Sequence, residues 1–395
     1  MTDVMFIDGA RTPFGRAGQK GVYWQTRADD LVVKALLGLM ARNPGVPAAS
    51  VDDVAIAATT QSGDQGLTLG RTCALLAGFP PSVPGFAIDR MCAGAMTSAA
   101  MLGSAIGFGA DDIVVAGGVE HMGRHPIGQD ATPNPRFLTE RLIDPDGFSM
   151  GATAERLHDR FPALTKERAD RFGMRSQQKM AAAYAAGKIQ PDLVPVAAPS
   201  DSGWQLVTED EGMRPETTMA ALAGLATPFR PGGRVTAGTA APLTDGATVC
   251  LLASAKTAKK RGLTPKMRLV GFAFAGVEPE LMGLGPIPAT ERALERSGLR
   301  FDDLGLIEVN EAFAVQVLAF LDHFGLGDDD PRVNVWGGAL AIGHPLAASG
   351  VRLMIQLAAQ FAERPDVRYG LTTMCVGLGQ GGSMIWENPH WRRRR

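Results

Sequence analysis

The apolar positions of the chain follow a helical period in some segments and form short continuous runs in others. LVVKALLGLMA at 31–41 has helical spacing, whereas VAIAAT at 54–59 and DIVVAGG at 112–118 are typical of buried strands. Helices that alternate with such strands indicate an α/β protein. Residues 120–245 differ, because they carry more proline, more charge and two helical patterns. We expect an inserted, mostly helical region there.

The early pattern returns late in the chain. A helix, an Asp-Asp pair and an apolar strand follow one another in ADDLVVKALLGLM…VDDVAIAAT and again in IPATERALERSG…FDDLGLIEVNEA. In each half, a later helix opens beside a reactive residue, which is Cys92 in the first half and His344 in the second. The pattern predicts two copies of one α/β unit. The expected parts are an N-terminal half at 1–119 plus 246–269, an inserted loop domain at 120–245 and a C-terminal half at 270–395.

Composition is that of a globular protein with a large core, because 45% of the residues are hydrophobic and 20% are charged. The formal net charge of −2 gives no general attraction to nucleic acid or to an anionic membrane. We therefore expect neither as a partner. The one charge run, Arg392–Arg395, is interpreted as a solvated, mobile tail.

The sequence also gives little sign of a targeting segment or of a disulfide framework. MTDVMFIDGARTPFG has no basic stretch followed by an apolar one, so we expect no signal peptide. We find no run of 18 apolar residues without charge and expect no membrane span. The chain has four cysteines, Cys73, Cys92, Cys250 and Cys375, and none of them form a CxxC pair. This pattern fits free thiols in a reducing cytoplasm. We interpret Cys73 and Cys250 as core residues.

Cys92 lies in DRMCAGAMTSA, directly before small and apolar residues that predict a buried helix. A thiol at a helix start lies near free backbone N–H groups and the positive end of the macrodipole. This position is expected to lower the pKa of the thiol and to favour a nucleophile. A packed core thiol is the alternative that this segment alone leaves open.

Three further residues lie where strands or glycine-rich turns end. His344, between Gly343 and Pro345, is the one histidine of six in such surroundings, although a hydrogen-bonded loop histidine also fits. Asn310 interrupts the strand-to-helix passage IEVNEAFAVQVLAF, where its amide can hold a water or a carbonyl, or form a structural turn. Cys375 ends a predicted strand. Two thiols and one imidazole that converge from repeated units suit acyl transfer to sulfur.

Two other motifs favour no cofactor site. Gly377, Gly379 and Gly382 spell G-x-G-x-x-G, but a strand and the end of the chain follow in place of the helix that a dinucleotide site needs. His121 and His125 are four residues apart, yet no third ligand is apparent, so we expect no metal.

These motifs together resemble the thiolase family, the acyl-CoA:acetyl-CoA acyltransferases, over essentially the whole chain. The matching segments are ARTPFGR, Cys92, AGGVEHM, SMGATAE, DEGMRPETT, LTDGA, NEAFA, GHP and Cys375-Val376-Gly377. The resemblance implies two βαβαβαββ halves in five αβαβα layers, with a loop domain inserted in the first half. It also implies coenzyme A as co-substrate, no permanently bound cofactor, and a homodimer or homotetramer. A hydratase–dehydrogenase subunit is a further candidate partner.

The resemblance also implies catalytic roles. Cys92 would be the acylated nucleophile, and His344 would activate it. Asn310 would hold a water that completes an oxyanion site with His344. Cys375 would move the proton of the acetyl α-carbon or of the CoA thiol. The backbone N–H groups of Cys92 and Gly377 would form a second oxyanion site.

Coenzyme A contacts are implied in the loop domain and around the NEAFA motif. Arg214 would meet the adenine or a phosphate, and three residues would line the pantetheine channel. The family's usual Asn-x-Ser is 239–241 Thr-Ala-Ala here, which removes a side-chain contact. The substrate-binding candidates are Met150, Arg214, Ala241, Ala312 and Phe313.

We therefore predict a 3-ketoacyl-CoA thiolase that acts in fatty-acid β-oxidation. Ser149 stands where short-chain biosynthetic members often carry histidine, which disfavours an acetoacetyl-CoA thiolase working in synthesis. A non-catalytic acyl-CoA-binding subunit is disfavoured because Cys92, Asn310, His344 and Cys375 are all present. A decarboxylating ketosynthase is disfavoured by the second cysteine.

Overall fold

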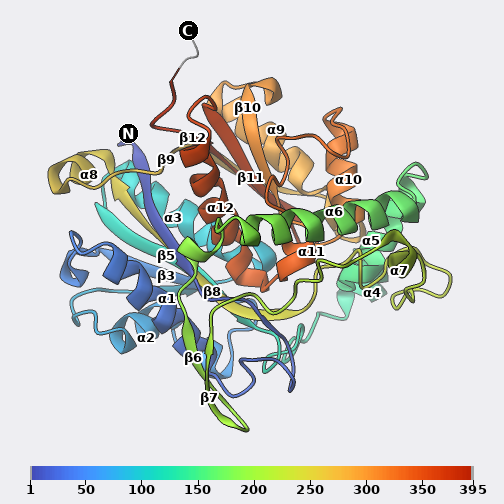
Figure 1. The fold of residues 1–395 in the computed structure, drawn as a ribbon, viewed down its shortest axis with the longest axis horizontal. Helices are drawn as coiled ribbons and strands as arrows, with labels where there is room; N and C mark the ends of the chain where they lie inside the picture. The colour runs from blue at the N-terminus through green and yellow to red at the C-terminus, as the bar shows by residue number, and fades with distance from the viewer. Residues whose placement is uncertain (1, 393–395) are drawn as a thin grey trace.

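The computed structural model describes residues 2–392, so most of the predicted arginine tail lies outside the described residues. Its main sheet has the strand order β10-β11-β12-β9-β1-β8-β5-β3-β4, with β2 paired to β8. A hairpin of β6 and β7 stands apart from this sheet and projects at one end of the molecule (Figure 1). The strands are β1 (Val4–Arg11), β2 (Gly15–Arg16), β3 (Asp53–Ala57), β4 (Phe86–Ile88), β5 (Ile113–His121), β6 (Val196–Ser200), β7 (Gly203–Val207), β8 (Thr244–Ser254), β9 (Met267–Gly276), β10 (Leu304–Val309), β11 (Tyr369–Val376) and β12 (Gln380–Glu387).

Helices connect these strands and cover both faces of the sheet (Figure 1). They are α1 (Ala28–Arg42), α2 (Leu69–Leu76), α3 (Gly94–Phe108), α4 (Arg136–Thr139), α5 (Met150–Arg160), α6 (Lys166–Ala185), α7 (Met219–Ala223), α8 (Ala255–Arg261), α9 (Pro286–Ser297), α10 (Ala314–His323), α11 (Ala339–Ile342) and α12 (Ser349–Glu363). Two 3-10 turns matter for the site. They are η3 (Met91–Ala93), directly before α3, and η8 (Leu346–Ala348), directly before α12.

Five layers result from the period-2 alternation of the strands. In β8, Val249 and Leu251 pack in the cluster that contains α1 and α2, whereas Cys250 and Leu252 pack in the cluster of α3 and α12. The C-terminal strands likewise face α3 and α12 on one side and α9 and α10 on the other. Strands β1 and β9 pair over only Met5–Arg268 and Phe6–Met267, which is where the sheet divides into two half-sheets. The predicted αβαβα arrangement is confirmed.

The sequence repeat corresponds to matched elements in the two halves. The first copy is α1 followed by β3, and the second is α9 followed by β10. Helix α3 then leads to β5, and α12 leads to β11, as the pattern predicted. Strand β12, which follows the glycine-rich motif near the C-terminus, replaces the helix that a dinucleotide site would need.

The segment between β5 and β8 holds α4 to α7, in agreement with its helical patterns. The hairpin β6–β7 in the same segment was not predicted from the sequence. The expected limits of the inserted domain, 120 and 245, fall in the last residues of β5 and the first residues of β8.

Helix α3 is apolar all round because it lies between the two half-sheets. The stretch Met91–Phe108 is long and apolar enough to span a membrane by length and composition alone. The expectation that no such uncharged run exists is therefore wrong. The reason for its apolarity is visible in the fold, since 67% of the stretch is buried inside the protein.

A buried ion pair joins β1 to the inserted segment. Arg11 donates from Nη1 and Nη2 to the two carboxylate oxygens of Asp210, at 2.6 and 2.7 Å. The Tyr184 hydroxyl donates to Asp210 Oδ2, and the Phe14 backbone N–H donates to Oδ1, each at 2.6 Å. The Arg11 side chain is 3% exposed and that of Asp210 is fully buried. The carboxylate thus anchors the segment before Arg214 to the core sheet.

Replacement of Asp210 by alanine is expected to lower the free energy of unfolding by about 3–5 kcal/mol, because it leaves the Arg11 cation buried without a counter-charge. Urea unfolding followed by circular dichroism measures this loss. The control is Glu167→Ala, which removes an exposed pair with Arg171 and should cost less than about 0.5 kcal/mol. Equal losses in the two variants would contradict an anchoring role for Asp210.

Candidate active site

Cys92 lies in the 3-10 turn η3, immediately before α3. The preceding residue, Met91, has a φ of 43°, a strained value for a residue that is not glycine. The Asp89 carboxylate holds this turn by accepting a hydrogen bond of 2.6 Å from the Met91 backbone N–H. Cys92 is only 7% exposed, and its turn contacts η8, β11 and α12.

The electrostatics of Cys92 differ from the sequence expectation. Burial raises the pKa of its thiol to about 12, although the backbone N–H groups of Gly377 and of Cys92 itself act to lower it. The predicted fall in pKa at a helix start is therefore wrong, because the cost of desolvating a thiolate outweighs the helix-end effect. The resting residue is a neutral thiol that needs a base.

Cys375 approaches the same point from the end of β11, which contacts η3. Burial raises the pKa of its thiol, and the charge of Cys92 raises it further, which shows that the two thiols are close. Gly377 borders the same point, since a Cβ there would lie 2.6 Å from Met91 Sδ and 3.5 Å from Met150 Sδ. The structure thus brings Cys92, Cys375, Gly377 and Met150 together.

His344 enters the site from the loop before η8. Gly343 has a φ of +97°, and a Cβ there would lie 2.1 Å from Thr244 Cγ2, so glycine alone allows this turn. The imidazole Nδ1 lies 2.6 Å from Ser349 Oγ, whose hydroxyl donates to the Pro345 carbonyl oxygen at 3.0 Å. Because that hydroxyl proton is engaged, Nδ1 carries the ring proton and Nε2 keeps a free lone pair.

The imidazole is held neutral. Burial, and then the charge of Arg352, lowers the pKa of His344 to about 3. A neutral ring with a free Nε2 can accept a proton from a thiol, which is what a general base requires. Ser349 was not identified from the sequence, although it lies only five residues after His344.

Asn310 lies fully buried at the end of β10, where its backbone N–H donates to the Thr373 carbonyl oxygen at 2.9 Å. Its side-chain Nδ2 lies 3.3 Å from His344 Nε2 and 3.4 Å from Nδ1, which places the amide nitrogen over the ring face. Its Oδ1 accepts a hydrogen bond of 2.9 Å from Arg352 Nη2. These contacts place the Asn310 amide against the His344 ring, and its role in holding a water for an oxyanion site stays a prediction.

Glu311, the next residue, fixes the chain that leads to His344. Its carboxylate accepts from the Ser176 hydroxyl at 2.6 Å, from Asn334 Nδ2 at 2.8 Å and from the Leu340 backbone N–H at 3.2 Å. Ser176 lies on α6 of the inserted segment and Leu340 on α11, just before His344. One buried carboxylate therefore holds the inserted segment and the histidine loop in register.

Glu120 is a second buried anchor, and the sequence reading did not single it out. Its Oε2 accepts from the backbone N–H groups of Thr59 and Ala347, both at 3.1 Å, and its Oε1 accepts from Gln65 Nε2 at 3.1 Å. Ala347 belongs to η8, next to His344. The available signal was a lone carboxylate inside the apolar strand AGGVEHM.

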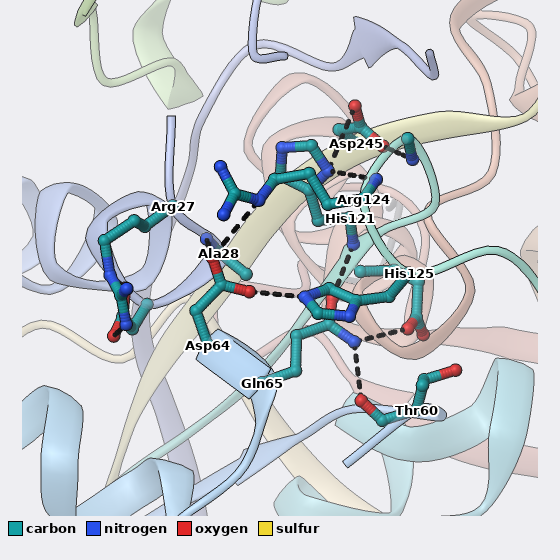
Figure 2. A network of polar contacts seen from close by, with 12 residues as sticks. Arg27, Ala28, Thr60, Asp64, Gln65, His121, Arg124, His125 and Asp245 are labelled. Atoms are coloured by element: carbon teal, nitrogen blue, oxygen red, sulfur yellow. Dashed lines mark hydrogen bonds and ion pairs between the residues drawn. The ribbon is translucent and has the colours of Figure 1, made fainter. Parts of the chain in front are cut away.

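The two histidines of HMGRH engage different carboxylates (Figure 2). His125 Nε2 pairs with Asp64, whereas His121 Nδ1 lies 3.4 Å from Asp245 Oδ2 and its Nε2 contacts the Tyr23 carbonyl oxygen at 2.9 Å. These rings therefore tie neighbouring loops together and do not converge on a common point.

The CoA-binding candidates divide into two groups. Ala241 donates its backbone N–H to the Ala312 carbonyl oxygen at 2.9 Å, and Phe313 follows directly, with its ring edge-on to Phe229. These residues form one wall beside Asn310. Arg214 lies apart from them and is exposed. Its backbone N–H donates to Gln177 Oε1 at 2.8 Å, and its carbonyl oxygen accepts from the Thr217 backbone N–H at 3.1 Å and from the Thr217 hydroxyl at 2.7 Å.

Comparison with known proteins agrees with this geometry. The family models described as the thiolase N-terminal domain and the thiolase C-terminal domain match residues 4–256 and 263–388. The chain belongs to the thiolase family. Thiolases are acyltransferases, with coenzyme A as co-substrate and no permanently bound cofactor, which confirms these predictions.

Relatives of this thiolase carry different substrate names. The 3-oxoadipyl-CoA/3-oxo-5,6-dehydrosuberyl-CoA thiolase of Escherichia coli K12 is 43% identical, over 98% of this chain and 100% of that protein. The 3-ketoacyl-CoA thiolase of Saccharophagus degradans is 41% identical, over 98% of each chain. The crystal structure of human mitochondrial 3-ketoacyl-CoA thiolase superposes with a TM-score of 0.89 at 33% identity, over 98% of this chain and 99% of that one.

The raised pKa of Cys92 predicts how the reactivity of its thiol changes with pH. Only the thiolate reacts with iodoacetamide, so alkylation of Cys92 should accelerate about tenfold per pH unit from about pH 6 to about pH 9, without a plateau. Peptide mass spectrometry measures the rate, and Cys92→Ala reports alkylation of the other cysteines. A plateau near neutral pH would instead indicate a resting thiolate–imidazolium pair.

Proposed function

We propose that this thiolase cleaves 3-ketoacyl-CoA with free CoA through an acyl-Cys92 intermediate. The observations that support it are a neutral Cys92 thiol beside the Gly377 N–H and a second thiol, Cys375, together with a neutral His344 imidazole directly before η8, the turn that packs against η3. Nucleophile, base and proton carrier are then separate groups. A ping-pong acyl transfer uses this separation, because each half-reaction moves two protons, one through His344 and one through Cys375.

In the first half-reaction, His344 Nε2 accepts the Cys92 proton while the sulfur attacks the 3-keto carbon of the substrate. The bond between C2 and C3 then breaks, which leaves an acyl thioester on Cys92 and a carbanion on acetyl-CoA. Cys375 donates its proton to that carbanion, and acetyl-CoA departs. In this proposal the Asn310–His344 pair, with a water held by Asn310, stabilises the enolate oxygen.

In the second half-reaction, the Cys375 thiolate takes the proton of the incoming CoA thiol. The CoA sulfur attacks the acyl-Cys92 carbonyl, whose oxygen accepts hydrogen bonds from the backbone N–H groups of Cys92 and Gly377. The tetrahedral intermediate expels the Cys92 sulfur, which recovers its proton from His344. The products are a shortened acyl-CoA and the starting enzyme.

A degradative role with a fatty 3-ketoacyl chain is the substrate class that we propose first. Ser149, at the position of the biosynthetic histidine, caps α5 by accepting from the Ala152 N–H at 3.4 Å. A 3-ketodicarboxylic chain is the second candidate, because the Escherichia coli relative is named for 3-oxoadipyl-CoA. A role in β-oxidation, a location in the cytoplasm and a hydratase–dehydrogenase partner stay predictions.

Thiolysis assays with acetoacetyl-CoA, 3-ketooctanoyl-CoA, 3-ketohexadecanoyl-CoA and 3-ketoadipyl-CoA test this proposal. We expect the highest kcat/KM with one of the longer chains. Cys92→Ser and His344→Ala should each lower kcat/KM by about 1,000-fold or more, because they remove the nucleophile or its base. Cys73→Ala and His323→Ala, one a buried core thiol and the other an exposed imidazole, are the matched controls.

The outcomes separate the alternatives. Preference for acetoacetyl-CoA would favour the short-chain enzyme. Turnover that survives Cys92→Ser would reject the acyl-cysteine route. A folded protein that binds acyl-CoA and turns over none of the substrates would favour the binding subunit.

We also propose a homo-oligomer. Strand β4 ends the main sheet and leaves one edge unpaired, and both α2 and α3 contact it. These helices expose large apolar side chains, namely Leu75, Leu76, Met101 and Phe108. An open edge beside apolar surface favours pairing with a second copy.

Light scattering after gel filtration should give a multiple of the chain mass, and Met101→Lys should lower the measured mass. A wild-type monomer would contradict the proposal.

A further inference from the structure

Arg352 occupies a position that local physical chemistry disfavours. It lies in the first turn of α12, where the positive end of the helix dipole repels a cation. It is also 2% exposed, in a helix whose remaining face packs against apolar core. Such a conflict between sequence and local structure is typical of functional sites.

The surroundings do not offset this cost with a good ion pair. Glu308 is the nearest carboxylate, and its Oε2 lies 3.9 Å from Arg352 Nη1. Burial raises the pKa of Glu308 to about 7, so this carboxyl is a weak counter-charge near neutral pH. Within residues 2–392, Arg352 Nε and Glu308 Oε2 have no hydrogen-bond partner. Simple stabilisation is therefore a poor explanation for the arginine.

Arg352 does make two well-formed hydrogen bonds. Nη2 donates to Asn310 Oδ1 at 2.9 Å, and Nη1 donates to Gln356 Oε1 at 3.1 Å. Gln356 in turn donates from Nε2 to the Gly337 carbonyl oxygen at 3.0 Å. Because its Oε1 is accepting and its Nε2 is donating, Gln356 holds the guanidinium in one orientation.

The contact with Asn310 has a directional consequence. A guanidinium has five donors and no acceptor, so only the oxygen of the Asn310 amide can face it. The amide nitrogen must then point the other way, over the His344 ring, where it lies. A flipped amide would instead present an oxygen lone pair to any negative charge that develops beside His344. The positive charge also polarises the amide and strengthens its N–H groups as donors.

We propose that Arg352 is a positioning residue that fixes the amide orientation of Asn310 and strengthens it as a donor to the enolate oxygen. This inference rests on the proposed function, since it assigns the enolate to the Asn310–His344 side of the site. Arg352 acts through Asn310 and does not itself touch the substrate.

A double-mutant cycle between Arg352 and Asn310 tests the proposal. Arg352→Met should lower kcat about 100-fold, as loss of an oxyanion donor does, with KM for CoA changed less than about threefold. In an Asn310→Ala background the same replacement should cost less than about threefold more, because the residue through which it acts is gone. Arg352→Lys should lose about tenfold, since one ammonium donor restores part of the contact.

Gln360→Leu is the matched control. Gln360 lies two turns further along the same buried face of α12 and donates to Glu308 Oε1 at 2.7 Å, without touching Asn310. It should change kcat less than about threefold. Circular dichroism and the unfolding midpoint of each variant show whether the fold is kept, and Arg352→Lys carries the test if Arg352→Met does not fold.

The results separate this inference from the proposed function. Loss of activity by the same factor with and without Asn310 would overturn it, as would an equal loss in Gln360→Leu or failure of both Arg352 variants to fold. An Asn310→Ala enzyme with wild-type kcat would reject the proposed role of Asn310 itself. A wild-type protein without thiolysis would reject the proposed function and, with it, this inference.

Discussion

The structure depends on how closely α3 and α12 approach each other between the two half-sheets. A Cβ on Gly350 would lie 2.6 Å from the Met96 backbone nitrogen, and one on Gly94 would lie 3.0 Å from the Ala347 Cβ. Any larger residue would push the turns η3 and η8 apart. Cys92 lies in one of these turns and His344 lies just before the other. The close contact of the two helices is therefore also what brings the two parts of the site together.

This packing sets the electrostatics of the site. Burial raises the pKa of Cys92 and lowers that of His344, so both groups rest in their neutral forms. Helix ends and N–H groups alone would favour a thiolate, but they are weaker than the loss of water around both turns. The charges that chemistry needs therefore form only transiently, in a setting where aligned N–H groups have their greatest effect.

A buried polar frame surrounds this neutral centre. Glu120 holds η8, Glu311 holds the loop that leads to His344, and Arg352 holds the amide of Asn310. Buried charged groups seldom increase stability compared with well-packed apolar residues. What these charged groups share here is that each one orients a part of the site, because each fixes a backbone turn or an amide that borders the reactive groups. The Arg11–Asp210 pair does the same for the inserted segment.

The sequence by itself determined the α/β class and the duplication, and it predicted the four reactive or amide residues of the candidate site. These follow from local signals, namely apolar period, repeated order and unusual residues beside glycine. Only the tertiary structure decided the direction of the pKa shift of Cys92, the hairpin β6–β7 and the contacts of Glu120, Ser349 and Arg352. Desolvation and hydrogen-bond partners depend on contacts between residues far apart in the chain, and a local pattern carries no information about them.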